Sequence, residues 1–219
     1  MVNAWYIFQK DLQQEYRTRY ALNAILLFAV VTLSAVSFAI GTYSVSQETL
    51  SALLWIILFF SSMSGLAHIF VREEETHTAE TLRLVATPTS IFLGKLLFNI
   101  ILLFMLEIII IPLFIGVMNL QVQNYLLFYL TLVIGSIGLA GGGTIVGAII
   151  SKASSKGALF TVLAFPILLP VLISGISATK KAVTQPLLAE AYGELQAIIA
   201  YAIVIITASI LLFDFIWDE

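Results

Sequence analysis

The chain has 219 residues, of which 60% are hydrophobic and only 11% are charged, and its formal net charge is −3. Soluble domains carry about a quarter charged residues, so water is not the main solvent of this surface, and the small negative charge excludes a strongly basic nucleic-acid binder. The sequence contains no cysteine, which excludes disulfides, thiolate nucleophiles and cysteine-ligated metals.

The first 20 residues predict an amphipathic helix at the membrane surface. Trp5, Phe8, Leu12 and Tyr16 recur at spacings of three and four, and aromatic residues of this kind favour the headgroup layer. The polar residues expected on most of the remaining surface are Lys10, Asp11, Gln14, Arg17 and Thr18. Residues 1–20 are interpreted as an interfacial elbow helix that leads into the first span, and a simple membrane anchor also explains the pattern.

Six stretches are long and apolar enough to cross the bilayer, which takes about 20 apolar residues for about 30 Å of hydrocarbon. They are residues 21–41, 50–71, 96–118, 125–150, 157–176 and 197–216. Continuous apolar runs favour helices over a β-barrel, whose strands would alternate between apolar and polar residues. The sequence therefore predicts an all-α integral membrane protein, a six-transmembrane-helix bundle with one domain over residues 1–219.

Lysine and arginine are distributed unevenly between the two sides of this bundle. Eight of the ten lie before the first span or in the connections on the same side. These eight are Lys10, Arg17, Arg19, Arg72, Arg83, Lys95, Lys152 and Lys156, whereas Lys180 and Lys181 lie on the other side. The positive-inside rule places the N-terminus in the cytoplasm, and an even number of spans returns the C-terminus to the same side.

The connection over residues 72–94 is the most informative cytoplasmic segment. It begins with Arg72 and the acids Glu73, Glu74 and Glu75, which suit the N-terminus of a helix. A short apolar stripe follows at Ala79, Leu82, Val85 and Ala86. Pro88 ends the helix and pushes Thr87 toward extended geometry. The pattern predicts a charged helix of two to three turns near the membrane surface, although an ordinary solvated loop also explains the charges.

The order of residues in this connection resembles the type-2 ATP-binding-cassette (ABC) permeases. The matching residues are Arg72-Glu73, Thr78-Ala79-Glu80-Thr81-Leu82, Pro88 and Gly94-Lys95, while His77 or Thr78 stands where that family often has glycine. The resemblance implies that residues 72–94 form the coupling segment that docks on an ATPase subunit. The implied partner-binding residues are Arg72, Glu73, Glu74, Thr78, Glu80, Leu82 and Arg83.

Two later motifs resemble the CcmB family, the membrane subunit of the haem exporter of cytochrome c maturation. They are the glycine-rich run from Gly135 to Thr144 and the run Phe165-Pro166-Ile-Leu-Leu-Pro170-Val-Leu-Ile173. The resemblance extends nearly end to end and implies an ABC-2-type permease in the bacterial inner membrane. The implied partners are two copies of an ABC ATPase, other cytochrome c maturation membrane proteins and a haem chaperone, with haem as cargo.

Small residues and prolines in the fourth and fifth spans have several physical explanations. Gly138 with Gly142, and Gly143 with Gly147, are i, i+4 pairs that let helices approach closely, either to pack the bundle or to form a homodimer. Pro166 and Pro170 each remove one helical hydrogen bond and kink the fifth span. Such kinks create a hinge, expose carbonyl groups to a cavity or only adjust the shape of the helix.

Glu107 is a carboxylate deep inside the third span, about 18 Å along the helix from Lys95 at 1.5 Å per residue. Ionisable groups in the membrane cost free energy and by default suggest function. A neutral carboxyl group bonded to Asn99 or to serine and threonine hydroxyls is the alternative. Pro112 kinks the same helix. The intramembrane functional candidates are therefore Glu107, Pro112, Pro166 and Pro170.

Known catalytic motifs are missing from the sequence. There is no G-x-x-x-x-G-K-[ST] phosphate-binding loop, no zinc-ligand spacing and no catalytic set, so we expect no catalytic residue, no metal site and ATP hydrolysis in a partner subunit. The predicted function is that of a permease subunit in cytochrome c maturation, acting in haem export or in ATP-driven release of a haem-loaded chaperone. The alternatives are a permease for a drug, lipid or glycan, and a non-transporting membrane scaffold.

Overall fold

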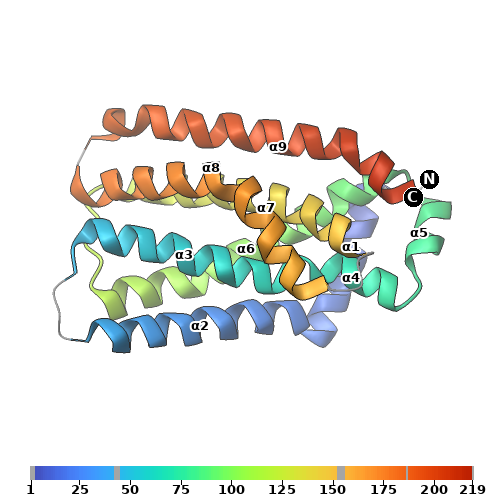
Figure 1. Cartoon of the computed structure of the whole chain (residues 1–219), viewed down its shortest axis with the longest axis horizontal. Coiled ribbons are helices and arrows are strands. Elements are labelled where there is room, and N and C mark those ends of the chain that lie inside the picture. The colour runs from blue at the N-terminus through green and yellow to red at the C-terminus, as the bar shows by residue number, and fades with distance from the viewer. Residues whose placement is uncertain (1–2, 42–44, 152–155, 186, 219) are drawn as a thin grey trace.

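The computed structural model describes residues 3–41, 45–151, 156–185 and 187–218. Among these residues, six helices are long and apolar enough to cross a membrane, and they run alongside one another (Figure 1). They are α2 (Tyr20–Ile40), α3 (Gln47–Gly65) continued by α4 (His68–Glu75), α6 (Pro88–Met118), α7 (Tyr125–Ser151), α8 (Lys156–Thr184), and α9 (Tyr192–Asp218) preceded by the 3-10 turn η1 (Leu188–Ala191). The prediction of an all-α, six-span membrane protein is confirmed.

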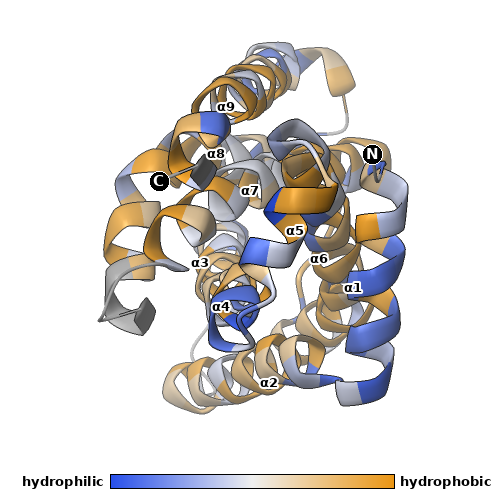
Figure 2. Ribbon diagram, turned by 90° about the vertical axis from the view of Figure 1, so that its right-hand side faces the viewer, coloured by the Kyte–Doolittle hydropathy of each residue, from blue (hydrophilic) through white to orange (hydrophobic). Residues whose placement is uncertain are grey.

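Two shorter helices, α1 (Ala4–Thr18) and α5 (Ala79–Val85), lie at one end of the bundle. Both ends of the chain lie beside them (Figure 1), as an even number of crossings requires. We call this the terminal end. Figure 2 looks onto it and shows hydrophilic residues gathered on α1 and α4, in front of spans that are mainly hydrophobic.

Several helices are longer than the sequence predicted. Arg72 and the three acids after it belong to the last turns of α4, so the prediction that they begin a separate helix is wrong. The span α6 already begins at Pro88, where the Thr87 side chain accepts a hydrogen bond from the Ser90 amide and Thr87 has the predicted extended geometry. The connection between the fifth and sixth predicted spans, residues 177–196, is also shorter, because α8 continues to Thr184 and α9 begins at Tyr192.

The helix α7 lies at the centre of the bundle because its glycines let neighbouring helices come close. Gly138 and Gly142 face α8, and a Cβ atom on Gly142 would lie 2.5 Å from Leu168 Cδ2. Gly143 and Gly147 face the junction of α3 and α4. These four glycines therefore let α7 pack closely on neighbouring helices of the same chain.

Trp55 anchors α3 to the two helices beside it. Its side chain is fully buried and lies between Gly135 of α7 and Gly175 of α8, where a Cβ atom would collide with the indole ring. The indole Nε1 donates to Thr179 Oγ1 at 2.8 Å. Because packing and a buried hydrogen bond act together, α3 is fixed to the bundle at this level.

Candidate functional site

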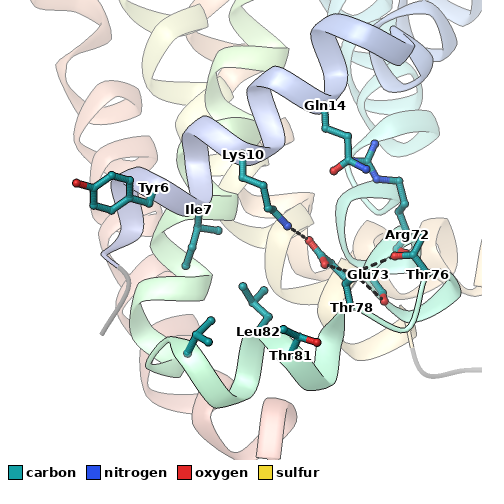
Figure 3. A pocket seen from close by; sticks show the side chains of 11 residues that line it. Tyr6, Ile7, Lys10, Gln14, Arg72, Glu73, Thr76, Thr78, Thr81 and Leu82 are labelled. Carbon is teal, nitrogen blue, oxygen red and sulfur yellow. Dashed lines mark hydrogen bonds and ion pairs between the residues drawn. The ribbon is translucent and has the colours of Figure 1, made fainter.

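A cavity of about 600 Å³ lies at the terminal end, between α1 and the α4–α5 segment (Figure 3). Its lining residues are Tyr6, Ile7, Lys10, Gln14, Arg72, Glu73, Thr76, Thr78, Thr81, Leu82 and Val85. Ile7 of α1 and Leu82 of α5 point toward each other from its two walls (Figure 3). The helices α1 and α5 therefore form the two walls of one cavity at this end of the protein.

Beside this cavity, a fully buried lysine joins three helices. The Nζ atom of Lys95, on α6, lies 2.9 Å from Glu73 Oε1 of α4 and 3.4 Å from Asp11 Oδ2 of α1. It also donates to the Ile69 carbonyl oxygen at 3.3 Å and lies 5.2 Å from the centre of the Phe70 ring. An unpaired buried ammonium group would cost several kcal/mol, so these partners keep α1, α4 and α6 together.

Glu73 is the acceptor that several donors share. Its carboxylate pairs with Lys10 as well as Lys95 and accepts from Thr78 Oγ1 at 2.5 Å. Burial by itself lowers the pKa of Lys10, but the carboxylates of Asp11 and Glu73 outweigh it and raise that pKa above its ordinary value. Glu73 is only 5% exposed, so it holds the segment from within and does not present its carboxylate to a partner.

The helix α1 packs on α6 through a face that differs from the predicted apolar stripe. The buried residues of this face are Ile7, Phe8, Asp11 and Glu15. Trp5 and Tyr16 are exposed, as suits the headgroup layer. The prediction that Asp11 lies on the outer polar surface is wrong, because its carboxylate is a counter-ion of Lys95.

The contact between α1 and α6 depends on Gly94. A Cβ atom there would lie 2.7 Å from the Ala4 carbonyl oxygen and 2.8 Å from Ile7 Cβ. We expect Gly94→Ala to displace α1 and to lower the free energy of unfolding by about 1–3 kcal/mol, measured by thermal unfolding in detergent. Gly116→Ala, in the same helix with no atom within 4 Å, is the control and is expected to leave stability unchanged or slightly raised. An equal loss of stability in both variants would contradict the close packing of α1 on Gly94.

The predicted partner-binding residues divide into exposed and buried groups. Thr78 and Glu80 are exposed, Arg72, Glu74 and Arg83 are partly buried, and Glu73 and Leu82 are buried. Sequence reasoning missed Leu84, which is 88% exposed on α5. Leu84 lies opposite the apolar stripe of its helix. A leucine at such a position is expected to be exposed, and this pattern could have identified Leu84 from the sequence.

The helix α5 also contacts the last span. The guanidinium carbon of Arg83 lies 5.3 Å from the centre of the Trp217 ring on α9, a geometry that favours a cation–π interaction. Trp217 stacks on Phe213 with ring centres 5.5 Å apart, and both rings contact Phe70 of α4. These rings thus form one aromatic cluster where α4, α5 and the end of α9 meet.

Glu107 and Pro112 line a groove of about 510 Å³ between α6 and α7. Glu107 is 8% exposed, and its Oε1 atom accepts from Ser136 Oγ at 2.5 Å. Tyr129 lies on the α7 side of the groove. The carboxyl group thus has a polar partner inside the bundle and is adjacent to an apolar surface.

Pro166 and Pro170 lie in α8, which bends between its two ends (Figure 1). The Tyr201 hydroxyl of α9 donates to the Ile167 carbonyl oxygen, between the two prolines. The structure thus places these prolines away from the groove beside Glu107, so the four intramembrane candidates do not form one site.

The fold and the terminal end define an all-α, multi-pass membrane protein with a helical unit outside its spans. A family model described as CcmB protein matches residues 2–215. The chain therefore belongs to the CcmB family over nearly its whole length, which makes it the membrane subunit of a haem exporter ABC transporter in cytochrome c maturation. This role implies partnership with an ABC ATPase and other maturation components. A search of curated proteins gives no match.

Proposed function

We propose that this permease subunit receives ATP-driven movement from its partner ATPase through α4 and α5. The observation that carries the proposal is the 88% exposure of Leu84, on a short helix outside the spans whose Leu82 faces the cavity beside α1 and whose Arg83 lies over the Trp217 ring of α9. Apolar side chains that are exposed together mark interaction sites, and Val85 beside Leu84 is 44% exposed as well. In this proposal ATP is hydrolysed by the partner, which is present in two copies.

The proposed docking surface consists of exposed residues, and the buried ones support it from behind. Thr78, Glu80 and Leu84 contact the ATPase, while Glu73 and Leu82 hold α4 and α5 against α1. Residues 1–20 act as the elbow helix and residues 72–94 as the coupling segment of a single permease domain over residues 1–219.

The proposed location is the bacterial inner membrane, with the terminal end in the cytoplasm. The lysines and arginines of α1, α4, α5 and the start of α6 support this orientation. Lys180 and Lys181 are at the opposite end of the bundle. A surface at the terminal end is therefore accessible to a cytoplasmic ATPase.

Covalent haem in a reporter c-type cytochrome tests the function. The host lacks its own CcmB protein and receives this chain together with its cognate ATPase. We expect the unchanged chain to restore haem attachment, Leu84→Asp to lose most of it, and Leu187→Asp to retain it, because Leu187 is 61% exposed at the opposite end.

The possible failures of this experiment point to different alternatives. No restoration by the unchanged chain, despite stable insertion and ATPase binding, would favour a permease for a drug, lipid or glycan. Full restoration by Leu84→Asp would favour a scaffold that does not couple ATP hydrolysis to movement. Detection of exported haem in the absence of the chaperone would separate haem export from ATP-driven release of a haem-loaded chaperone.

A further inference from the structure

The second span is interrupted between α3 and α4, at Leu66 and Ala67. The amides of Phe70 and Val71 both donate to the Ala67 carbonyl oxygen, at 3.2 Å each. In an uninterrupted α-helix, Phe70 would donate to the Leu66 carbonyl instead. The Leu66 carbonyl therefore leaves the ladder, and the ordinary spacing of four residues resumes with the bond from Val71 to Ala67.

A side chain from another span takes the place of the missing amide. Asn99 of α6 is fully buried, and its Nδ2 donates to the Leu66 carbonyl oxygen at 3.4 Å and to Thr144 Oγ1 of α7 at 2.9 Å. A buried carbonyl group without a donor costs free energy. Asn99 therefore stabilises the interrupted geometry from outside the helix that contains it.

Glycines lie at the closest contacts between the junction and the neighbouring helices. A Cβ atom on Gly143 would lie 2.6 Å from Leu66 Cδ1, and one on Gly147 would lie 3.2 Å from Ala67 Cα. On the opposite side, a Cβ atom on Gly65 would lie 2.4 Å from Ile25 Cγ2 and 3.3 Å from the Ala21 carbonyl oxygen, both of α2. The junction is thus packed closely on both sides, with Ile25 of α2 against Gly65 and Leu66 against Gly143 of α7.

The two parts of the interrupted span have different attachments. Trp55 fixes α3 to α7 and α8, whereas α4 is held by the ion pair of Glu73 with Lys95 of α6 and continues into α5 through a short connection. We propose that Leu66–Ala67 is the pivot about which α4 and α5 turn during ATP-driven movement, and that Asn99 is the residue that positions this pivot. This inference rests on the proposed function in naming the ATPase as the source of movement.

Spin labels on introduced cysteines test the pivot, because the chain has no cysteine of its own. One pair, Glu75→Cys with Asp214→Cys, measures α4 against α9. A control pair, Gln123→Cys with Tyr192→Cys, lies at the opposite end of the bundle. In the full chain without ATPase, we expect Asn99→Leu to shift or broaden the first distance distribution by about 2 Å or more and to leave the control pair unchanged.

Thr144→Val is the matched variant, because it removes the other partner of Asn99 and leaves the bond to Leu66. We expect Thr144→Val to give the same α4–α9 distance distribution as the chain with Asn99 and Thr144 intact. No effect of Asn99→Leu, or an equal effect of Thr144→Val, would overturn the proposal. If Asn99→Leu does not fold, Gly147→Ala takes its place, since its Cβ would press on Ala67, and an unchanged distribution would equally overturn the proposal.

The complex with ATPase provides the second measurement. A non-hydrolysable ATP analogue is expected to shift the α4–α9 distance and to leave the control pair unchanged. A shift in both pairs, or in neither pair while the ATPase is bound, would overturn the pivot. If the ATPase does not bind, the proposed function fails, and the measurements on the chain alone still decide whether Asn99 positions the junction.

Discussion

Replacing Lys95 by methionine is expected to lower the free energy of unfolding by about 3 kcal/mol, because the buried carboxylates of Asp11 and Glu73 keep only the more exposed Lys10 as counter-ion. Methionine preserves most of the length and apolar volume of the side chain, so the lost charge dominates the effect. Thermal unfolding in detergent measures it, and protease cleavage within α1 reports the release of that helix. We expect both the stability and the attachment of α1 to be lost together.

The exposed ion pair at the opposite end provides the control. Lys180 Nζ lies 2.5 Å from Glu48 Oε2, and the two side chains are 46% and 51% exposed. Lys180→Met is expected to cost about 0–1 kcal/mol, because water and salt screen an exposed pair. Adding Glu73→Gln to Lys95→Met should recover part of the loss. Equal effects of the two lysine variants would show that the buried network does not stabilise the terminal end.

Replacing Leu84 by aspartate is expected to weaken binding of the ATPase by about 30-fold or more, the effect of a central interface residue. The permease itself should keep its thermal stability, because Leu84 is 88% exposed. Titration of the ATPase onto the permease in lipid nanodiscs measures the affinity. A loss of affinity without a loss of stability would identify Leu84 as a docking residue.

Two leucine variants make this result specific. Leu187→Asp, at an exposed position of the opposite end, should leave ATPase affinity unchanged. Leu82→Asp should lower stability and affinity together, because Leu82 is 8% exposed and faces the cavity between α1 and α5. Unchanged affinity in Leu84→Asp would place the docking surface elsewhere.

The six spans could be predicted from the sequence because length and hydrophobicity of each segment determine whether it crosses a membrane. The geometry of Thr87 before Pro88 was predictable for a similar reason, since the restriction is local. The helix ends were less accurate: polar residues such as those of α4 continue a helix as readily as they begin one. Local rules therefore predicted the spans and left their ends uncertain by several residues.

The buried network could not be predicted from local patterns. Asp11, Glu73 and Lys95 are far apart in the chain, and only the packing of α1, α4 and α6 brings their side chains together. Within α5, the choice between Leu82 and Leu84 depends on which side of the helix α1 covers. The functional roles of Glu107 and of the prolines in α6 and α8 stay predictions.

The central claim is that α5 is the part of this permease that contacts the ATPase, and crosslinking tests it most directly. Leu84→Cys and Leu187→Cys each provide a single thiol, because the chain contains no cysteine. After assembly with the ATPase in membranes, a short thiol-reactive photocrosslinker is attached to each variant and activated. We predict a crosslink to the ATPase from residue 84 and none from residue 187. A crosslink from residue 187, or none from residue 84 in an assembled complex, would contradict the claim.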